Sequence, residues 1–280
     1  MMSVRIVTDS TCDLPQSVVD DLNIQVVPLY IHIGTEEYLD GIDISREEFY
    51  QGLSGYKEHP TTAAPGIDAF LRLYEGLAAE GATGVLSLHI SETLSNVVNV
   101  ARLAAQRMTA VPVTVIDSGQ LSLGLGLLAC AAAEVATAGG SMDDVVAKVQ
   151  ELMPRTYTFA ALSTVEFLRR SGRLTQFQSG LATLLRILPL LKMNKGVAEM
   201  EKVRTRTKSL QRLLTLVSDL GPLRTLAMVH TNAPQEAAAL HQQALHLIPP
   251  GTEPMYAQVT PVIGAHIGPG AVGFVAIQEA

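Results

Sequence analysis

The stretch ATGVLSLHISETLSNVVNVARLAAQRM, residues 82–108, decides which fold is expected for the rest of the chain. It begins with the apolar run 85–90, which is typical of a short buried strand. A polar turn, 91–93, follows, and apolar residues then recur at helical spacing over 97–105. A strand followed by a tight turn and a helix is the unit from which α/β folds are built.

Two hydroxyl side chains, Ser91 and Ser95, lie where this strand gives way to the helix. The first turn of a helix carries unpaired N–H groups and partial positive charge, so hydroxyls beside it can help to bind a carboxylate or phosphate. A serine at this position can equally serve as the helix cap. The stretch by itself favours the cap.

The first half of the chain repeats this alternation. Strands are predicted over 4–7, 24–33 and 111–116, and the Ala-rich run 121–133 predicts a buried helix. Connections this short between strands predict a doubly wound parallel sheet through residue 153. Capping boxes or caps are expected at Ser45 and Ser141.

Polar loops follow the predicted strands. In open α/β sheets, ligands bind outside the carboxyl ends of the strands. The loop TDSTCD, 8–13, is in such a place, although Asp, Ser and Thr are also common in turns because they bond to their own backbone. A second hydroxyl-bearing loop is predicted over 59–66.

The pattern changes after Pro154. Two strands, 188–193 and 197–203, flank a hairpin-like turn, and further strands are predicted over 255–262 and 273–278. Hairpins mixed with helices predict an α+β domain with a mainly antiparallel sheet. The fold class expected is therefore α/β in two domains: a Rossmann-like parallel-sheet sandwich over 1–154, and an α+β domain over 155–280.

Composition restricts the function. Of the 280 residues, 48% are hydrophobic, which is enough for a large core, and the net charge of -7 argues against nucleic-acid binding. Cys12 and Cys130 lack the spacing of a metal or redox motif, which fits a cytoplasmic setting. The most apolar run ends at Glu134, too early for a membrane span.

Few motifs point to catalysis. The sequence 268–273 spells GxGxxG, but a strand is predicted after it where a dinucleotide fold needs a helix. Walker A, GxSxG and HExxH motifs are absent, so no metal, cofactor or catalytic residue is expected.

His266 falls in a glycine-rich segment, 264–268, predicted as a loop between strands, and is either solvated or functional. Two basic clusters, 169–173 and 202–208, are either solvated faces or anion-binding surfaces.

Taken together, seven short stretches resemble the DegV family of bacterial fatty-acid-binding proteins over essentially the whole chain. The stretches that carry the resemblance, in chain order, are IVTDSTCDLP (6–15), PTTAAP (60–65), ISETLSNVVNVA (90–101), VIDS (115–118), FLRRSGRL (167–174), KVRTRTKS (202–209) and GAHIGPGAVG (264–273).

The resemblance implies a site for the carboxylate of one long-chain fatty acid between the two domains. The family's carboxylate-binding Thr and Ser fall on Thr62 and Ser95, and its loop histidine falls on His266. Its arginines near the mouth of the site, associated with a partner kinase, fall on Arg173 and Arg204.

This chain departs from the family pattern at the head-group site. Ala63, Ala64 and Asn96 replace polar or small residues of the family, which leaves fewer hydroxyls around the carboxylate. We therefore expect Thr61 or Ser91 to compensate.

The function implied is that of a non-catalytic carrier. It would bind a fatty acid such as palmitate in a hydrophobic tunnel and present the carboxylate to a fatty acid kinase. It would then hold the acyl phosphate for phospholipid synthesis, with transient membrane contact. Two alternatives stay open: a phosphotransferase or hydrolase that uses His266 with Ser95, and a regulatory module for another lipid or amphipathic carboxylate.

Overall fold

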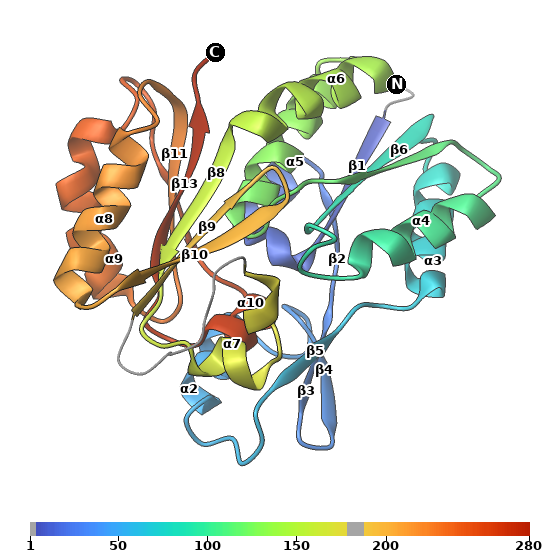
Figure 1. The fold of residues 1–280 in the computed structure, drawn as a ribbon. Helices are drawn as coiled ribbons and strands as arrows, with labels where there is room; N and C mark the ends of the chain where they lie inside the picture. The colour runs from blue at the N-terminus through green and yellow to red at the C-terminus, as the bar shows by residue number, and fades with distance from the viewer. Residues whose placement is uncertain (1–3, 178–187) are drawn as a thin grey trace.

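The computed structural model describes residues 4–177 and 188–280. Its first layer is a four-stranded sheet in the order β2-β1-β6-β7, in which every neighbouring pair is parallel (Figure 1). The parallel sheet predicted for the first half is therefore confirmed. Its strands are β1 (Val4–Asp9), β2 (Gln25–Val27), β6 (Gly84–His89) and β7 (Val113–Asp117).

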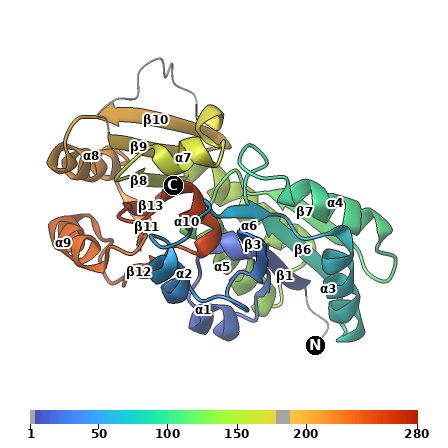
Figure 2. The same ribbon diagram turned by 90° about the horizontal axis from the view of Figure 1, so that it is seen from below.

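Helices cover both faces of the parallel sheet. Two of them pack together on one face, and two others pack together on the opposite face (Figure 2). Such double coverage explains why the strands are apolar on both sides. The first pair is α3 (Ile67–Ala79) and α4 (Val97–Arg107), and the second is α5 (Leu123–Thr137) and α6 (Met142–Leu152).

The second half of the chain forms a six-stranded sheet in the order β10-β9-β8-β13-β11-β12. All its neighbouring pairs are antiparallel except β11 with β12, which confirms the mainly antiparallel sheet. The strands are β8 (Thr156–Ala161), β9 (Leu188–Asn194), β10 (Val197–Val203), β11 (Leu223–His230), β12 (Met255–Gln258) and β13 (Val272–Gln278). Its outer face is covered by α8 (Arg206–Ser218) and α9 (Pro234–Ala244).

Helix α5 is shared by the two sheets. It packs against β1 on one side and against β8 and β13 on the other, and 12 of its 15 residues are buried. A helix that is buried all round needs no polar face, which explains the uninterrupted apolar run. Close approach also requires glycine, because a Cβ at Gly126 would lie 2.5 Å from the carbonyl oxygen of Cys12.

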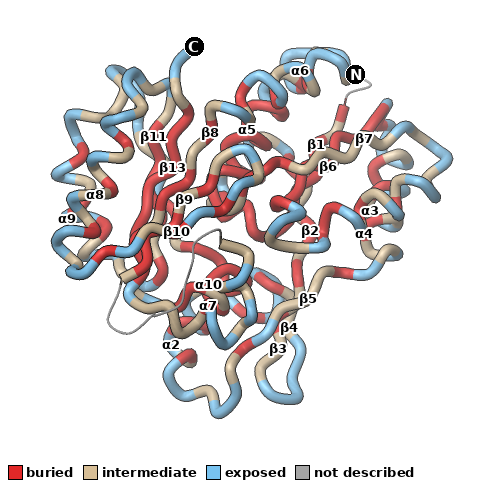
Figure 3. The backbone as a smooth tube through the Cα atoms, in the orientation of Figure 1, coloured by how far each residue is buried: buried red, intermediate tan, exposed pale blue. Residues whose placement is uncertain are grey.

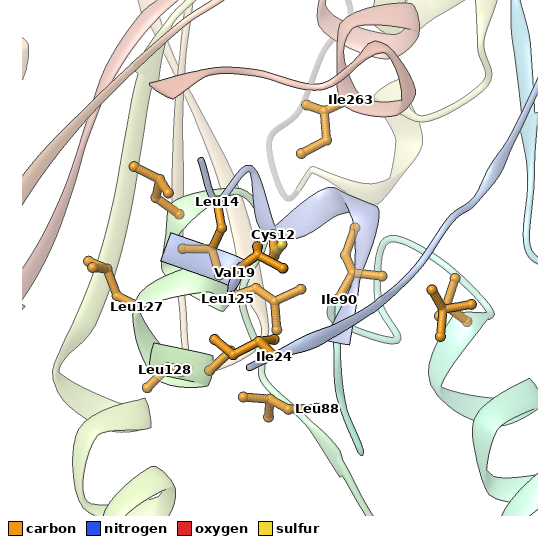
Figure 4. Packing of buried hydrophobic residues seen from close by; sticks show 14 of the residues in the cluster. Cys12, Leu14, Val19, Ile24, Leu88, Ile90, Leu125, Leu127, Leu128 and Ile263 are labelled. Carbon is orange, nitrogen blue, oxygen red and sulfur yellow. The ribbon is translucent and has the colours of Figure 1, made fainter. Parts of the chain in front are cut away.

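One hydrophobic cluster extends from the parallel sheet through α5 to the inner face of the six-stranded sheet. Figure 3 shows the buried residues concentrated along these layers, and Figure 4 shows Cys12 and Leu14 packed beside Leu125. A smaller cluster lies beneath α8 and α9. The strands of the parallel sheet all precede residue 154 and those of the six-stranded sheet all follow it; the domain boundary itself stays a prediction.

A small antiparallel sheet was missed by the sequence patterns. It has the order β4-β3-β5, with β3 (Tyr30–Ile33), β4 (Glu36–Leu39) and β5 (Thr61–Ala63). The single strand predicted over 24–33 is wrong, because the chain leaves the parallel sheet at Pro28, which has no N–H for a ladder. The segment 59–66 is likewise not all loop, since it contains β5.

His266 does not lie in a loop. The strand predicted over 255–262 ends at Gln258, and helix α10 (Pro261–Ile267) follows. Thr260 is in the N-cap position, and Pro261 suits the first helical turn because its missing N–H would have been unpaired there. The sequence patterns did not predict this helix because Gly264 lies within it and Gly268 directly follows it.

The remaining helices are short. Both predicted N-termini are confirmed as capping boxes, with Ser45 paired to Glu48 and Ser141 paired to Asp144. Among the described residues, no helix has both the length and the apolar character needed to cross a membrane. The short elements are α1 (Gln16–Asp21), α2 (Arg46–Gly52), α7 (Glu166–Arg170) and the 3-10 turns η1 (Ser10–Cys12), η2 (Met153–Arg155), η3 (Leu174–Gln176) and η4 (Leu245–Leu247).

Candidate functional site

A cavity lies where the carboxyl ends of β1 and β6 meet β5, β9 and α10. This is the edge of the parallel sheet at which ligands bind in open α/β folds. The cavity has a polar end and an apolar wall. The polar lining residues are Thr11, Thr62, Ser95, Asn96, Arg173, Gln176 and His266. The apolar ones are Leu29, Ala63, Ala64, Ile90, Leu94, Leu121, Leu168, Phe177, Leu191, Val262, Ile263 and Ile267.

Thr62 and His266 meet at the polar end. They are 204 positions apart in sequence, yet Thr62 Oγ1 lies 2.8 Å from His266 Nε2. The edge strand β5 presents the threonine and α10 presents the histidine. The other ring nitrogen of His266, Nδ1, is buried and has no hydrogen-bond partner among the described residues.

The environment of His266 keeps its imidazole neutral. Burial is the main cause, followed by the positive charges of Arg173 and His59, and together they lower its pKa to about 3. Because the pKa in the folded protein is below the value of 6.5 for a free histidine, this group's contribution to stability is complete above pH 6.5. The contribution is lost as the pH falls from 6.5 toward 3.

The unpaired nitrogen also selects the tautomer of His266. A buried N–H without an acceptor is rarer and less favourable than a buried lone pair, so we place the hydrogen on Nε2. The ring then donates to Thr62 Oγ1, and the threonine hydroxyl is free to donate into the cavity. This arrangement offers a hydrogen-bond donor to an anionic group.

Arg173 supplies positive charge at the same end. Its guanidinium donates to the carbonyl oxygen of Ser171 at 2.9 Å, and no carboxylate of the described residues lies within ion-pair distance. Its neighbours in the basic cluster differ, because Arg169 and Arg170 both pair with Glu166. A cation without a protein counter-ion beside a cavity favours an anionic ligand.

Ser95 lines the cavity just before α4. Its backbone N–H donates to the carbonyl of Ser91 at 3.1 Å, and the N-cap position falls on Asn96, whose side chain makes no capping bond. The interpretation of either serine as the cap is therefore wrong. Ser95 and Asn96 line the cavity at the start of α4, where their polar groups can meet an anion.

Three other predicted residues lie away from the cavity. Ser91 is fully buried, and its hydroxyl contacts that of Thr93 at 3.0 Å. Thr61 is exposed beside Thr62, and Arg204 is exposed after β10. The structure thus brings together four of the predicted residues, Thr62, Ser95, His266 and Arg173.

The cavity continues into a deeper, almost wholly apolar one. The two share a set of large apolar residues: Leu94, Leu121, Phe177, Leu191, Ile263 and Ile267. The deeper part adds Ala160, Met193, Val229 and Val259, together with Lys192, whose ammonium group pairs with Glu199 at 3.1 Å. Two hydroxyls there already have partners, because Ser122 donates to Asp13, and Thr158 donates to Gln120 at 2.9 Å. The polar end therefore leads into an apolar channel.

A series of buried, hydrogen-bonded polar side chains, which we call the polar chain, lies behind the polar end of the cavity. The sequence patterns did not predict it. Asp9 Oδ2 accepts from the N–H of Ile90 at 3.0 Å and contacts His89 Nδ1 at 3.0 Å. His89 Nε2 contacts the hydroxyl of Ser87 at 2.6 Å, and that hydroxyl contacts Tyr74 at 2.8 Å. All four side chains of the chain are fully buried.

The order of these contacts fixes where the hydrogens lie. A carboxylate only accepts, so His89 Nδ1 carries a hydrogen, and in the neutral ring Nε2 then accepts from Ser87. Tyr74 in turn donates to Ser87. Asp9 also accepts from the hydroxyl of Thr11 at 2.5 Å, so the chain ends at the cavity wall. Asp, His and Ser occur here in triad order, but Ser87 is sealed from solvent and cannot act as a nucleophile.

The described residues contain no group of three or more His, Cys, Asp or Glu side chains that could hold a metal ion. The parallel sheet, the polar end and the apolar channel together define an α/β protein with a cavity that is polar on one side and apolar on the other.

The chain belongs to the DegV family. The family model described as "Uncharacterised protein, DegV family" matches residues 3–279. A DegV domain-containing protein of Streptomyces coelicolor is 37% identical over 276 residues, with 97% of each chain covered. Protein DegV of Bacillus subtilis is 30% identical over 278 residues, with 97% of this chain and 98% of that protein covered.

Solved structures of DegV proteins are similar to this structure over the full length of the chain. The structure of a DegV family protein from Thermus thermophilus, described by its fatty acid binding, has a TM-score of 0.89 at 34% identity and covers 99% of this chain and 100% of that chain. DegV from Bacillus subtilis, described as a fatty acid binding protein, has a TM-score of 0.90 at 29% identity and covers 100% of both chains. The fold class is thus shared with DegV proteins.

Proposed function

We propose that this protein binds one long-chain fatty acid, with the carboxylate at the polar end of the cavity and the acyl chain in the apolar channel. The observation that carries the proposal is the pairing of Thr62 with a neutral His266, which frees a hydroxyl donor beside Arg173, a cation with no carboxylate partner among the described residues. The fatty acid binding of the similar DegV proteins from Thermus thermophilus and Bacillus subtilis supports the same ligand class.

The carboxylate of the ligand needs strong hydrogen-bond partners. Without them, its desolvation would cost more free energy than burial of the acyl chain could offset. Hydrogen bonds to a charged group contribute about 1.5–3 kcal/mol each. Thr62 and Ser95 line the cavity and provide two such donors. Ala63 and Ala64 line the same cavity without adding donors, so these few contacts hold the carboxylate.

The acyl chain supplies most of the attraction. Burial of apolar surface contributes about 0.8 kcal/mol per methylene, so a chain of about fourteen methylenes gains roughly 11 kcal/mol before the entropy cost of binding. Leucine, isoleucine and phenylalanine side chains line the channel that would receive it. A ligand held in this way dissociates slowly and should remain bound during purification.

The carrier role extends this proposal. A carboxylate held at an accessible polar end can be presented to a fatty acid kinase, and the acyl phosphate product can then be held for phospholipid synthesis. We propose that Arg204, exposed after β10, contacts the kinase, while Arg173 faces the head group. The protein would act in the cytoplasm on fatty acids such as palmitate, with transient contact to a membrane and no catalysis of its own.

A hydrolase or phosphotransferase that pairs His266 with Ser95 has less support. A nucleophile and its base should be in hydrogen-bond contact, whereas the hydrogen-bond partner of His266 among the described residues is Thr62. A strongly lowered pKa also makes this histidine a weak base.

Substitutions at Arg173 and Arg204 distinguish binding of the head group from contact with a partner. We expect Arg173→Gln to weaken fatty acid binding about tenfold, because it removes a charge-assisted interaction worth roughly 1.4 kcal/mol. Arg204→Gln should leave the affinity unchanged. Titration of delipidated protein with a fluorescent fatty acid measures both values, and equal affinities for the two variants would contradict this placement of the head group.

A further inference from the structure

A second polar cavity lies on the other side of the turn that follows β1. Thr11 in this turn lines the lipid cavity, whereas Ser10 and Cys12 line the second one. Its wall also contains Asp40 from the end of the small sheet and Thr260 from the start of α10. The two cavities have no lining residue in common.

Asp40 is the unusual group in this second cavity. It is only 4% exposed, yet neither carboxylate oxygen has a hydrogen-bond partner among the described residues. The neighbouring hydroxyl of Ser10 lowers the pKa of Asp40 in part, although it does not reach hydrogen-bond geometry with either oxygen. The hydroxyl of Thr260 on the same wall is also buried and has no hydrogen-bond partner within residues 4–177 and 188–280.

The charges around Asp40 leave room for one positive charge. Arg46 and the buried carboxylates of Asp13 and Asp9 face it from the neighbouring elements, and Asp20 and Cys12 also line the cavity. The guanidinium of Arg46 is directed at backbone carbonyls, including that of Leu14 at 3.1 Å, and not at Asp40.

Three carboxyl groups, those of Asp9, Asp13 and Asp40, share this region with the single guanidinium of Arg46, so carboxyl groups outnumber cationic ones. Three residues that carry hard oxygen atoms line this cavity: Asp40, Ser10 and Thr260. A single carboxylate with neutral oxygens suits a monovalent cation better than a divalent one, which prefers several carboxylates.

We propose that this cavity binds a compact monocation on Asp40, either an alkali metal ion or the ammonium group of a small amine. The site is separate from lipid binding, so its existence does not depend on the proposed carrier function. Occupancy would tie the end of the small sheet to the start of α10, because Asp40 and Thr260 belong to these two elements.

Protonation of Asp40 competes with the cation. Burial, together with the charges of Asp13 and Asp9, raises the pKa of Asp40 to about 7 against the opposing effects of Ser10 and Arg46. A raised pKa means that this group's contribution to stability is complete below pH 3.8 and is lost as the pH rises through 7. A cation would restore stability above pH 7 and have little effect below it.

The test is thermal unfolding at pH 6 and pH 8 in equal concentrations of potassium, sodium, methylammonium or tetramethylammonium chloride. Tetramethylammonium is the control for ionic strength because it is bulky and has no N–H. We expect the bound cation to raise the melting temperature by about 2–4 °C at pH 8 when its concentration is several times its Kd, and by less at pH 6. A shift with a metal ion alone identifies a metal site, and a shift with methylammonium alone identifies an amine site.

Two variants decide whether Asp40 is responsible. Asp40→Asn should abolish the cation-specific shift without changing fatty acid binding, whereas Asp21→Asn, an exposed acid outside the cavity, should retain the shift. Should Asp40→Asn fail to fold, the 13C carboxyl resonance of Asp40 in the unsubstituted protein provides the readout, and its pKa should fall when the cation is added. Equal melting temperatures in all four salts, an unchanged shift in Asp40→Asn, or an unchanged carboxyl titration would overturn the proposal.

Discussion

The double variant Thr62→Ala, Ser95→Ala should bind a long-chain fatty acid about 10²- to 10⁴-fold more weakly than the unsubstituted protein. Two hydrogen bonds to a carboxylate are lost, at about 1.5–3 kcal/mol each, and each 1.4 kcal/mol corresponds to a tenfold change in Kd. The substitutions do not change the apolar channel, so the residual affinity should come from burial of the acyl chain. Titration of delipidated protein with a fluorescent fatty acid measures the change.

Thr61→Ala is the matched control for this variant. The same hydroxyl is removed one residue away, but Thr61 is exposed and does not line the cavity. We expect its affinity to equal that of the unsubstituted protein. An unchanged Kd in the double variant, or an equal loss in Thr61→Ala, would remove Thr62 and Ser95 from the head-group site.

His89→Ala should reduce the free energy of unfolding by about 3–5 kcal/mol. Removing the fully buried ring leaves a cavity, and Asp9 loses one of its buried hydrogen-bond partners. The contact with Ser87 would be lost as well. Urea denaturation, followed by circular dichroism, gives the free energy directly.

The control is the same substitution at His246, which is exposed in η4 and outside both hydrophobic clusters. We expect a change within about 0.5 kcal/mol there. A loss of less than 1 kcal/mol in His89→Ala would show that the polar chain does not support the end of the parallel sheet.

Local patterns were sufficient for much of the fold. The strand, turn and helix within 82–108 were correct because apolar spacing reports directly on burial. The capping box at Ser45 and the cap at Ser141 were predicted correctly because their hydrogen bonds connect residues only three positions apart. The small sheet was missed because β5 pairs with β3 across 30 residues, and no local pattern specifies such a pairing.

The candidate site was only partly accessible from sequence. Ser95 was a candidate from its position between strand and helix, whereas Thr62 was selected through the family resemblance. The contact of Thr62 with His266 depends on a helix that the sequence patterns missed. His89 was overlooked because it lies at the end of an apolar strand, and its pairing with Asp9 of the candidate loop 8–13 requires β1 and β6 to be neighbours. Contacts of this kind depend on which strands are neighbours and on how they are aligned, and local sequence patterns do not specify either.

The most direct test of the account is mass spectrometry of the organic extract from purified, denatured protein. The account predicts about one equivalent of a long-chain fatty acid in the unsubstituted protein and a much smaller amount in Thr62→Ala, Ser95→Ala. An extract without any acyl ligand, combined with no binding when a fatty acid is added to the delipidated protein, would contradict it.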